Sequence, residues 1–360
     1  MTELADAGAS APADVENLCT FYFQATPATT YWRCELPAKY LPGAVHAAPQ
    51  LRVTQEDDGS LGFPDLEGDA AIMQFPGDNG TAIVLMALQS QGKKFFVEVD
   101  DNYLDRGDEL WRVRAGWGRN IGDTPHTTEG HRWIAEHADG VIVTTEALRE
   151  AYLKANDNVY VCRNTIDPDD WLAPSERDET FRIGWYASGS HDRDSEVVRK
   201  AMAWASRQPD VEIVNIGLNP PGWNFTRTWH GWRDDFKEHR AVLGTLDVGI
   251  SPLIGTPMTP FRSDLKALEY AMGGAMPMLQ AARPYDEWRD FEFVRMCWTP
   301  DDWMDALKWA VRNRDEVRHK AQQAREYVMR ERTFRTEITK WKDALCRVNG
   351  SGCSSPTTCR

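Results

Sequence analysis

The stretch LDVGISPLIGTPMTPFRSDLKALEYAMGGAMP, residues 246–277, contains two short apolar runs separated by a loop and an amphipathic segment. The runs at 248–252 and 275–279 have the length and composition of buried strands. The segment 263–272 has helical spacing and ends at a glycine pair that suits a helix C-cap. A strand, a helix and a second strand in this order form the repeating unit of a parallel sheet, so the stretch predicts an α/β protein.

The same alternation extends from this stretch in both directions and falls into two series. One series covers residues 18–163, and the second starts at residue 181. The acidic, polar segment between them has the composition of a linker, and two domains agree with the length of 360 residues. We predict two Rossmann-like, doubly wound domains that face an interdomain cleft. The predicted limits are a disordered N-terminus at 1–15, an N-terminal domain at 16–175, a C-terminal domain at 176–335, a C-terminal helix at 336–348 and a disordered tail at 349–360.

The charge of the chain is distributed unevenly. Residues 1–175 carry 13 basic and 28 acidic side chains, whereas residues 176–360 carry 28 basic and 27 acidic ones. The apolar content of 42% excludes a disordered or fibrous protein. The acidic first half disfavours a protein that binds nucleic acid through a basic surface.

Cysteine usage and hydropathy exclude further classes. The seven cysteines form no C-x-x-C pair, so neither a disulfide framework nor a zinc site is indicated, and we predict no metal. The longest apolar run, residues 82–88, is too short to cross a bilayer. The acidic N-terminus has no signal-peptide pattern. We therefore expect a cytoplasmic protein without a membrane span.

Ligands of open parallel sheets bind beyond the carboxyl ends of the strands, so the residues that follow each strand are the site candidates. The predicted strand 181–186 is followed by Ala-Ser-Gly-Ser and then by a helix. This segment is either a loop whose backbone amides bind an anion or an ordinary strand-to-helix turn. The motifs G-x-G-x-x-G and G-x-x-x-x-G-K-[ST] are absent, which disfavours dinucleotide and NTPase sites. Ser263 is the predicted N-cap of a helix with Lys266 in its first turn and Glu269 one turn further. A phosphate near Ser263 and Lys266 would place Glu269 beside a ribose; a solvated Lys266–Glu269 pair is the alternative.

Two segments of the first half are also candidates. Asp100 and Asp101 end the strand predicted at 94–99, where adjacent carboxylates could bind an acceptor, act as a base, hold a divalent metal or cap the next turn. The segment 105–126 combines arginines and tryptophans that could stack on a sugar or a base and bind phosphate, or could form part of the core. These residues are Arg106, Trp111, Arg112, Arg114, Trp117 and Arg119.

Taken together, these segments resemble the GT-B fold glycosyltransferases, specifically the large retaining family 4-like group and its compact phage-encoded members. The resemblance implies an acceptor-binding N-terminal domain, a nucleotide-sugar-binding C-terminal domain and a reaction in the cleft between them. The matching pieces follow one another in the expected order: residues 94–103 (KFFVEVDDNY), 138–148 (ADGVIVTTEAL), 159–171 (VYVCRNTIDPDDW), 181–194 (FRIGWYASGSHDRD) and 246–277.

The resemblance also assigns roles to individual residues. Glu269 matches the second glutamate of the family's E-x7-E motif and would hold the donor ribose, whereas Phe261 replaces the first. Catalytic candidates are Asp100, Asp101 and one of the histidines His126 and His131. The donor diphosphate would be bound by Gly184, Ser188, Gly189, Ser190, Arg193, Ser263 and Lys266. The acceptor would contact Arg33, Arg112 and Trp117.

The implied activity is transfer of a hexose from a UDP- or GDP-sugar to an acceptor hydroxyl, with retention. No cofactor or metal is expected, because Lys266, helix amides and the Gly/Ser loop would stabilise the departing diphosphate. A virion or host protein or a glycan is the expected acceptor, in the host cytoplasm if the chain is phage-encoded. One alternative is a hydroxymethylated DNA base, which the acidic first half disfavours. Another is a catalytically silent nucleotide-sugar-binding protein, which Phe261 favours; the oligomeric state is left open.

Overall fold

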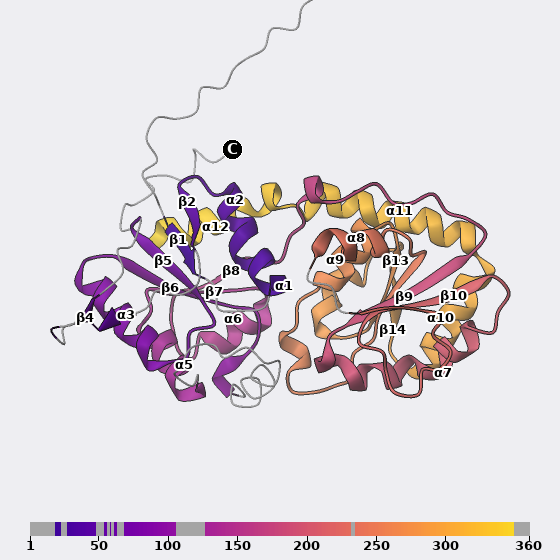
Figure 1. Ribbon diagram of the computed structural model, residues 1–360, viewed down its shortest axis with the longest axis horizontal. Helices are drawn as coiled ribbons and strands as arrows, with labels where there is room; N and C mark the ends of the chain where they lie inside the picture. Colours follow the sequence, from indigo (N-terminus) through magenta and orange to yellow (C-terminus); the bar gives the residue numbers. More distant parts are fainter. Residues whose placement is uncertain are drawn as a thin grey trace, which may run out of the picture.

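The structure is a computed structural model, and it describes residues 19–22, 27–47, 54–55, 58, 61–62, 68–105, 127–231 and 235–348. The chain forms two lobes, each built on a six-stranded parallel sheet with helices on its faces (Figure 1). This confirms the predicted α/β class and the two doubly wound sheets. No helix in the described part of the chain is long and apolar enough to span a membrane.

The first sheet has the strand order β2-β1-β5-β6-β7-β8. Its central strands β5 and β6 are buried except for Lys94 at the start of β6, as expected for a parallel sheet covered by helices on both faces. A short antiparallel pair, β3 (Thr54–Gln55) and β4 (Leu61–Gly62), lies outside it. The strands are β1 (Cys19–Tyr22), β2 (Ala44–Ala47), β5 (Ala70–Gln74), β6 (Lys94–Val99), β7 (Gly140–Val143) and β8 (Val159–Val161). The helical segments are α1 (Pro27–Thr30), η1 (Tyr31–Glu35), α2 (Leu36–Tyr40), α3 (Asn79–Ser90), α5 (Thr128–His137), α6 (Glu146–Tyr152) and η2 (Pro168–Asp170).

The second sheet has the strand order β11-β10-β9-β12-β13-β14. The strands are β9 (Phe181–Ala187), β10 (Val211–Gly217), β11 (Thr228–His230), β12 (Val248–Ser251), β13 (Met276–Gln280) and β14 (Arg295–Cys297). The helical segments are η3 (Gly189–Asp194), α7 (Ser195–Ala205), α8 (Phe236–Leu243), η4 (Thr259–Phe261), α9 (Leu265–Met272), η5 (Arg283–Trp288), α10 (Pro300–Arg312) and α11 (Arg314–Glu331).

The strand–helix–strand unit predicted in residues 246–277 is β12-α9-β13. β12 and β13 pair in parallel, with Val248 opposite Met276. A Cβ at Gly249 would lie 2.1 Å from the ring of Tyr270, so only a glycine in β12 allows α9 to pack this closely. The contact between Gly249 and Tyr270 therefore sets the short distance between α9 and the sheet.

The chain crosses between the lobes twice. After β8 it passes into the second lobe, and after α11 the helix α12 (Phe334–Val348) returns to pack on the first (Figure 1). The ring of Trp341 lies 5.8 Å from that of Phe21 in β1. The two crossing segments pair at a parallel bridge between Ile166 and Thr333. The lobes are thus joined by two hydrogen-bonded segments, and one buried apolar cluster extends through both. The domain limits given above remain predictions.

Some elements differ from the sequence prediction. The short edge strands β2, β11 and β14 were not predicted, because three or four residues on the edge of a sheet show no recognisable period. The helix α8, of eight residues, was also not predicted. The prediction of Ser263 as the N-cap of α9 is wrong. The helix begins at Leu265, and Asp264 occupies the cap position without a side-chain cap hydrogen bond.

Candidate functional site

The carboxyl end of the second sheet gathers the charged residues predicted to bind a donor. β9 ends at Ala187 and leads into η3, while the loop after β12 leads through η4 into α9. Glu269 projects from the second turn of α9 and is 4% exposed. It accepts a hydrogen bond from the hydroxyl of Tyr186, and its Oε1 lies 3.8 Å from Nε2 of His239. Burial raises the pKa of Glu269 to about 7.

Lys266 lies one helical turn before Glu269 and carries the most unusual charge of the site. Its Nζ is buried and has no hydrogen-bond partner among the described residues. The ammonium lies 5.2 Å from the centre of the Tyr186 ring. Burial and the nearby Arg262 lower the pKa of Lys266 to about 7. A buried cation without a hydrogen-bonding partner is rare in folded proteins, and an anionic ligand would supply what it lacks.

A second cation is held beside Lys266 by a chain of hydrogen bonds. Nδ1 of His191 lies 2.6 Å from a carboxylate oxygen of Asp194, and Arg262 donates from Nη1 to Nε2 of His191 over 2.6 Å. The other carboxylate oxygen of Asp194 accepts from the backbone of Ile254 at 2.8 Å. Burial and the charge of Lys266 lower the pKa of His191 to about 3, so the neutral ring donates from Nδ1 and accepts at Nε2. The arrangement fixes the guanidinium of Arg262 next to Lys266.

No protein-family model and no curated protein matches the sequence. Solved structures do match. HepE from Anabaena, in complex with UDP, has a TM-score of 0.62 and 12% identity, over 92% of this chain and 100% of that one. Sucrose-phosphate synthase from Thermosynechococcus elongatus has a TM-score of 0.59 and 13% identity, over 92% and 98%. TarM has a TM-score of 0.56 and 15% identity, and the match covers 77% of this chain but only 54% of TarM. The fold is the GT-B fold.

In this GT-B chain, Phe261, which stands where the resemblance predicts a glutamate, has a packing role. Phe261 ends η4 in the second lobe, and its half-buried ring packs against the apolar core of the first lobe. Ser263, two residues later, accepts a hydrogen bond from Nδ2 of Asn164 at 2.9 Å. Asn164 follows the last strand of the first sheet. Both residues therefore hold the lobes together at the start of the helix that carries Lys266.

The predicted diphosphate-binding residues around η3 fall into two groups. Gly184 lies inside β9, and a Cβ there would lie 2.2 Å from Leu246, so its glycine is explained by packing and we remove it from the donor-binding set. Ser188 is the N-cap of η3, and Arg193 in the same segment is exposed. The backbone of Gly189 and Ser190 forms the first turn of η3. Ser188, Gly189, Ser190 and Arg193 remain predicted ligands.

Two predictions in the first lobe require correction. Arg33 is 1% exposed and donates to Glu98 at 2.6 Å and to the carbonyl of Cys162 at 2.8 Å, so no exposed guanidinium remains for an acceptor. His131 is completely buried between the carbonyl of Pro76, 2.5 Å from Nδ1, and the hydroxyl of Tyr152, 2.8 Å from Nε2. It fixes the loop after β5 and cannot face a donor sugar. His126, Arg112 and Trp117 lie outside the described residues.

Asp100 and Asp101 follow β6, at the carboxyl end of the first sheet. Both side chains are half-buried, and the hydroxyl of Tyr152 donates to the carbonyl of Asp101 at 3.4 Å. Among the described residues, no group of three or more His, Cys, Asp or Glu side chains could hold a metal ion. The functions of this aspartate pair remain predictions.

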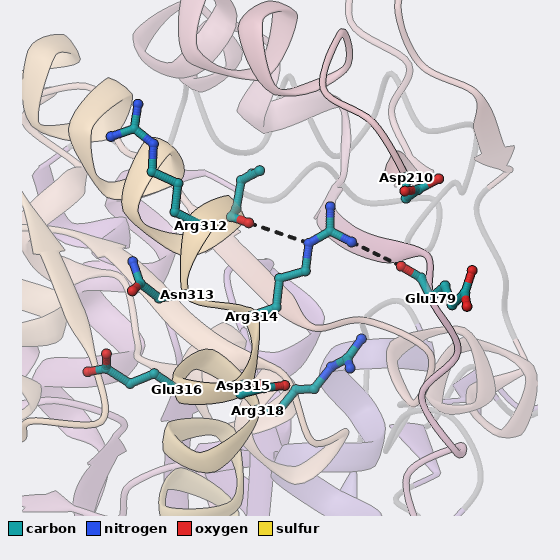
Figure 2. A pocket seen from close by; sticks show the side chains of 9 residues that line it. Glu179, Asp210, Arg312, Asn313, Arg314, Asp315, Glu316 and Arg318 are labelled. Carbon is teal, nitrogen blue, oxygen red and sulfur yellow. Dashed lines mark hydrogen bonds between the residues drawn. The ribbon is translucent and has the colours of Figure 1, made fainter.

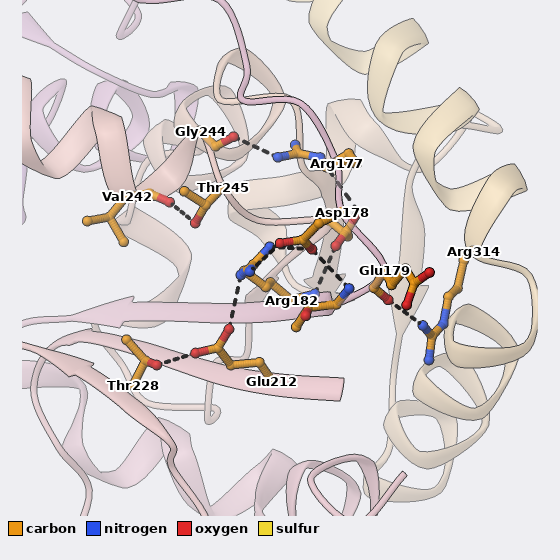
Figure 3. Close-up of polar contacts among 12 residues, drawn as sticks. Arg177, Asp178, Glu179, Arg182, Glu212, Thr228, Val242, Gly244, Thr245 and Arg314 are labelled. Atoms are coloured by element: carbon orange, nitrogen blue, oxygen red, sulfur yellow. Dashed lines mark hydrogen bonds and ion pairs between the residues drawn. The ribbon is translucent and has the colours of Figure 1, made fainter. Parts of the chain in front are cut away.

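A hollow of about 770 Å³ lies at the opposite, amino end of the second sheet (Figure 2). Two arginines of its lining are bonded within the protein: Arg314 donates to the carbonyls of Glu179 at 3.0 Å and Pro209 at 2.8 Å, and Arg318 donates to the carboxylate of Asp247 at 3.0 Å. Figure 3 shows Arg182 beside this region, paired with Asp178 at 2.9 Å and with Glu212 at 3.0 Å. Ligands of open parallel sheets bind beyond the carboxyl ends of the strands, so we do not assign the donor site to this hollow.

Proposed function

We propose that this protein is a glycosyltransferase that moves a hexose from a UDP- or GDP-linked donor to an acceptor hydroxyl. One observation carries the proposal: the ammonium of Lys266 is buried without a hydrogen-bond partner, one helical turn from the buried carboxyl of Glu269, at the carboxyl end of the second GT-B sheet. HepE, which has the same fold, has been crystallised with UDP and with UDP-glucose. These complexes support a uridine nucleotide as the first donor to test.

The donor is placed by the chemistry of these side chains. The diphosphate binds between Lys266 and Arg262, with the backbone of η3 and Ser188 and Arg193 beside it. The ribose diol donates hydrogen bonds to Glu269, replacing the hydroxyl of Tyr186 that occupies the carboxyl in the ligand-free protein. Lys266 leaves the ring of Tyr186 to meet the phosphate.

The proposed reaction depends on stabilising the negative charge that develops on the departing diphosphate. The bond between the anomeric carbon and the β-phosphate oxygen breaks, and the two cations stabilise the charge on the departing diphosphate. The oxygen of the acceptor hydroxyl bonds to the anomeric carbon on the face that the phosphate leaves. Its proton passes to the departing phosphate oxygen, which gives retention without a covalent intermediate. No metal ion is required by this scheme.

The acceptor belongs to the first lobe in this proposal. The acidic charge of residues 1–175 favours a protein or glycan over DNA, because contact with DNA phosphates requires lysine and arginine. Asp100 and Asp101 stand at the acceptor side of the reaction, with the segment that contains Arg112, Trp117 and His126 as the other predicted contact. A phage context and a cytoplasmic location belong to the same proposal.

The test is a donor screen on the purified protein. UDP- and GDP-hexoses are added singly, the melting temperature is measured, and release of UDP or GDP is followed with water or added acceptors. We expect one donor to raise the melting temperature and to be turned over. Binding without turnover would indicate the silent nucleotide-sugar-binding protein, and the absence of any binding would refute the proposal.

A further inference from the structure

The helix α8 carries two neighbouring residues that face different parts of the protein. His239 lies against the proposed ribose site: its Nε2 is 3.8 Å from Glu269, and its ring centre is 5.0 Å from that of Tyr186. Arg240, the next residue, is 8% exposed and points into a cage of aromatic rings. Its guanidinium carbon lies 4.8 Å from the ring centre of Tyr31, 5.4 Å from those of Trp171 and Phe236, and 5.9 Å from that of Trp32.

The rings of this cage come from both lobes. Tyr31 and Trp32 belong to η1 and follow the first strand of the first sheet, whereas Phe236 starts α8 in the second lobe. Trp171 lies in the segment that crosses between the lobes. The rings of Tyr31 and Phe236 also touch directly, with centres 4.9 Å apart. The guanidinium of Arg240 is therefore an interlobe contact.

The guanidinium has more aromatic contacts than hydrogen bonds. Nη1 donates to the carbonyl of Asp170 at 3.2 Å and lies 3.8 Å from its carboxylate, which also accepts from the hydroxyl of Tyr31. Nε and Nη2 are buried and have no hydrogen-bond partner among the described residues. The aromatic faces stabilise this cation, and separation of the lobes would remove at least two of them.

We propose that Arg240 is a positioning residue that holds the two lobes in the arrangement required for sugar transfer. His239 is on the same short helix as Arg240 and lies against Glu269 of α9, so α8 links this interlobe contact to the proposed ribose site. The inference rests on the proposed function for its catalytic readout, while the lobe arrangement can be measured without it. The nucleotide is bound by the second lobe, but transfer needs an acceptor from the first.

The experiment compares Arg240→Ala and Arg240→Lys with Arg199→Ala. Arg199 is an exposed control on α7, 3.9 Å from Glu196 and remote from both features. UDP affinity is measured by calorimetry, kcat and KM are measured for UDP-glucose (or for the donor that the screen identifies), and lobe separation is measured by small-angle X-ray scattering.

We expect Arg240→Ala to lower kcat by tenfold or more, to change UDP affinity by less than about threefold and to increase the radius of gyration. Arg240→Lys, which keeps the cation but loses the planar group, should recover part of kcat. The control should match the natural protein.

Several results would overturn the proposal. One is an Arg240→Ala protein with unchanged kcat and an unchanged radius of gyration; another is a proportional loss of UDP affinity and kcat, which would indicate a local effect on the donor site. If Arg240→Ala does not fold, Trp171→Leu removes one ring and leaves the cation, and the same split between kcat and UDP affinity is expected. If the natural protein binds neither UDP nor GDP, the proposed function fails, whereas the scattering comparison still decides the interlobe role.

Discussion

The two ends of the second sheet both carry buried or partly buried charged side chains. They differ in the hydrogen-bond partners that these side chains have. At the amino end, Arg182 and Arg314 are surrounded by carboxylates and carbonyls that accept their hydrogen bonds (Figures 2 and 3). At the carboxyl end, Lys266 is buried without a hydrogen-bond partner, and Glu269 is buried with a raised pKa. A hollow of about 770 Å³ lies at the amino end, away from the proposed donor site. The buried ammonium of Lys266, one helical turn from the buried carboxyl of Glu269, distinguishes the carboxyl end as the candidate ligand site.

The sharpest test of this comparison exchanges one carboxylate at each end for alanine. Glu269→Ala should lower UDP affinity by about 100-fold, because hydrogen bonds to a charged group contribute about 1.5–3 kcal/mol each. Glu212→Ala, at the amino end beside Arg182, should leave the affinity unchanged. Calorimetry with UDP measures both. Equal losses would mean that the two ends do not differ in function, and circular dichroism checks that each variant is folded.

A pair of cation substitutions should change stability in opposite directions. Lys266→Met should lower UDP affinity by about 30-fold and raise the melting temperature of the ligand-free protein, because it replaces an unpartnered buried charge by an apolar side chain. Arg314→Met should lower the melting temperature, because two carbonyls lose their donor, while UDP affinity stays the same. A destabilised Lys266→Met protein would contradict the description of the carboxyl end.

The pH dependence of UDP binding follows from the pKa of Lys266. Since this pKa is about 7, the charged fraction falls as the pH rises, and the contribution of Lys266 to UDP affinity should drop about fivefold between pH 7 and pH 8. Glu269, whose pKa is also about 7, titrates in the same range, so the drop is measured against Lys266→Arg, which keeps its charge and shares the titration of Glu269. The stability of the ligand-free protein should change in the reverse sense. The lysine's pKa is lower in the folded than in the unfolded chain, so the unfolded chain binds more protons above pH 7 and stability rises with pH there.

The smallest expected effect is at the amino end. Arg182→Ala removes two partly exposed ion pairs, with Asp178 and Glu212, and should lower the free energy of unfolding by about 0.5–1 kcal/mol. Urea unfolding measures this, and UDP affinity should be unchanged. A change in UDP affinity with normal stability would show that the two ends communicate through β9.

The sequence allowed prediction of the parts that depend on local pattern. Apolar periodicity in residues 246–277 predicted the β12-α9-β13 unit, and helical spacing placed Lys266 and Glu269 on one face of α9. The hydrogen-bonded chain from Asp194 through His191 to Arg262 was missed, because Arg262 is 71 residues away from His191 and only the folded sheet brings them together. The one available signal was their position, since both follow the carboxyl end of a strand.

The wrong predictions have a common physical reason. Asp264 takes the cap position, but its carboxylate accepts from Trp288 at 2.9 Å and from Arg332 at 2.7 Å, so a tertiary contact replaces the local cap. Arg33 and His131 have residue types that suit a site, but each is buried and bonded to partners from distant segments, although Nη2 of Arg33 has no partner among the described residues. The residue type indicates which ligand a side chain could bind. Whether the side chain can reach a ligand depends on its burial and on the partners that it already has in the fold.

Because α12 returns to the first lobe, the second lobe can be completed before the first lobe during synthesis. Trp341 is 1% exposed and packs near Phe21 and beneath the guanidinium of Arg33, so the first sheet lacks part of its cover until residue 348 has left the ribosome. The second lobe is complete earlier, although it is translated later. A nascent chain that stops after α11 would therefore contain every element of the second lobe, but it would lack the helix that covers the apolar face around Phe21 in the first lobe.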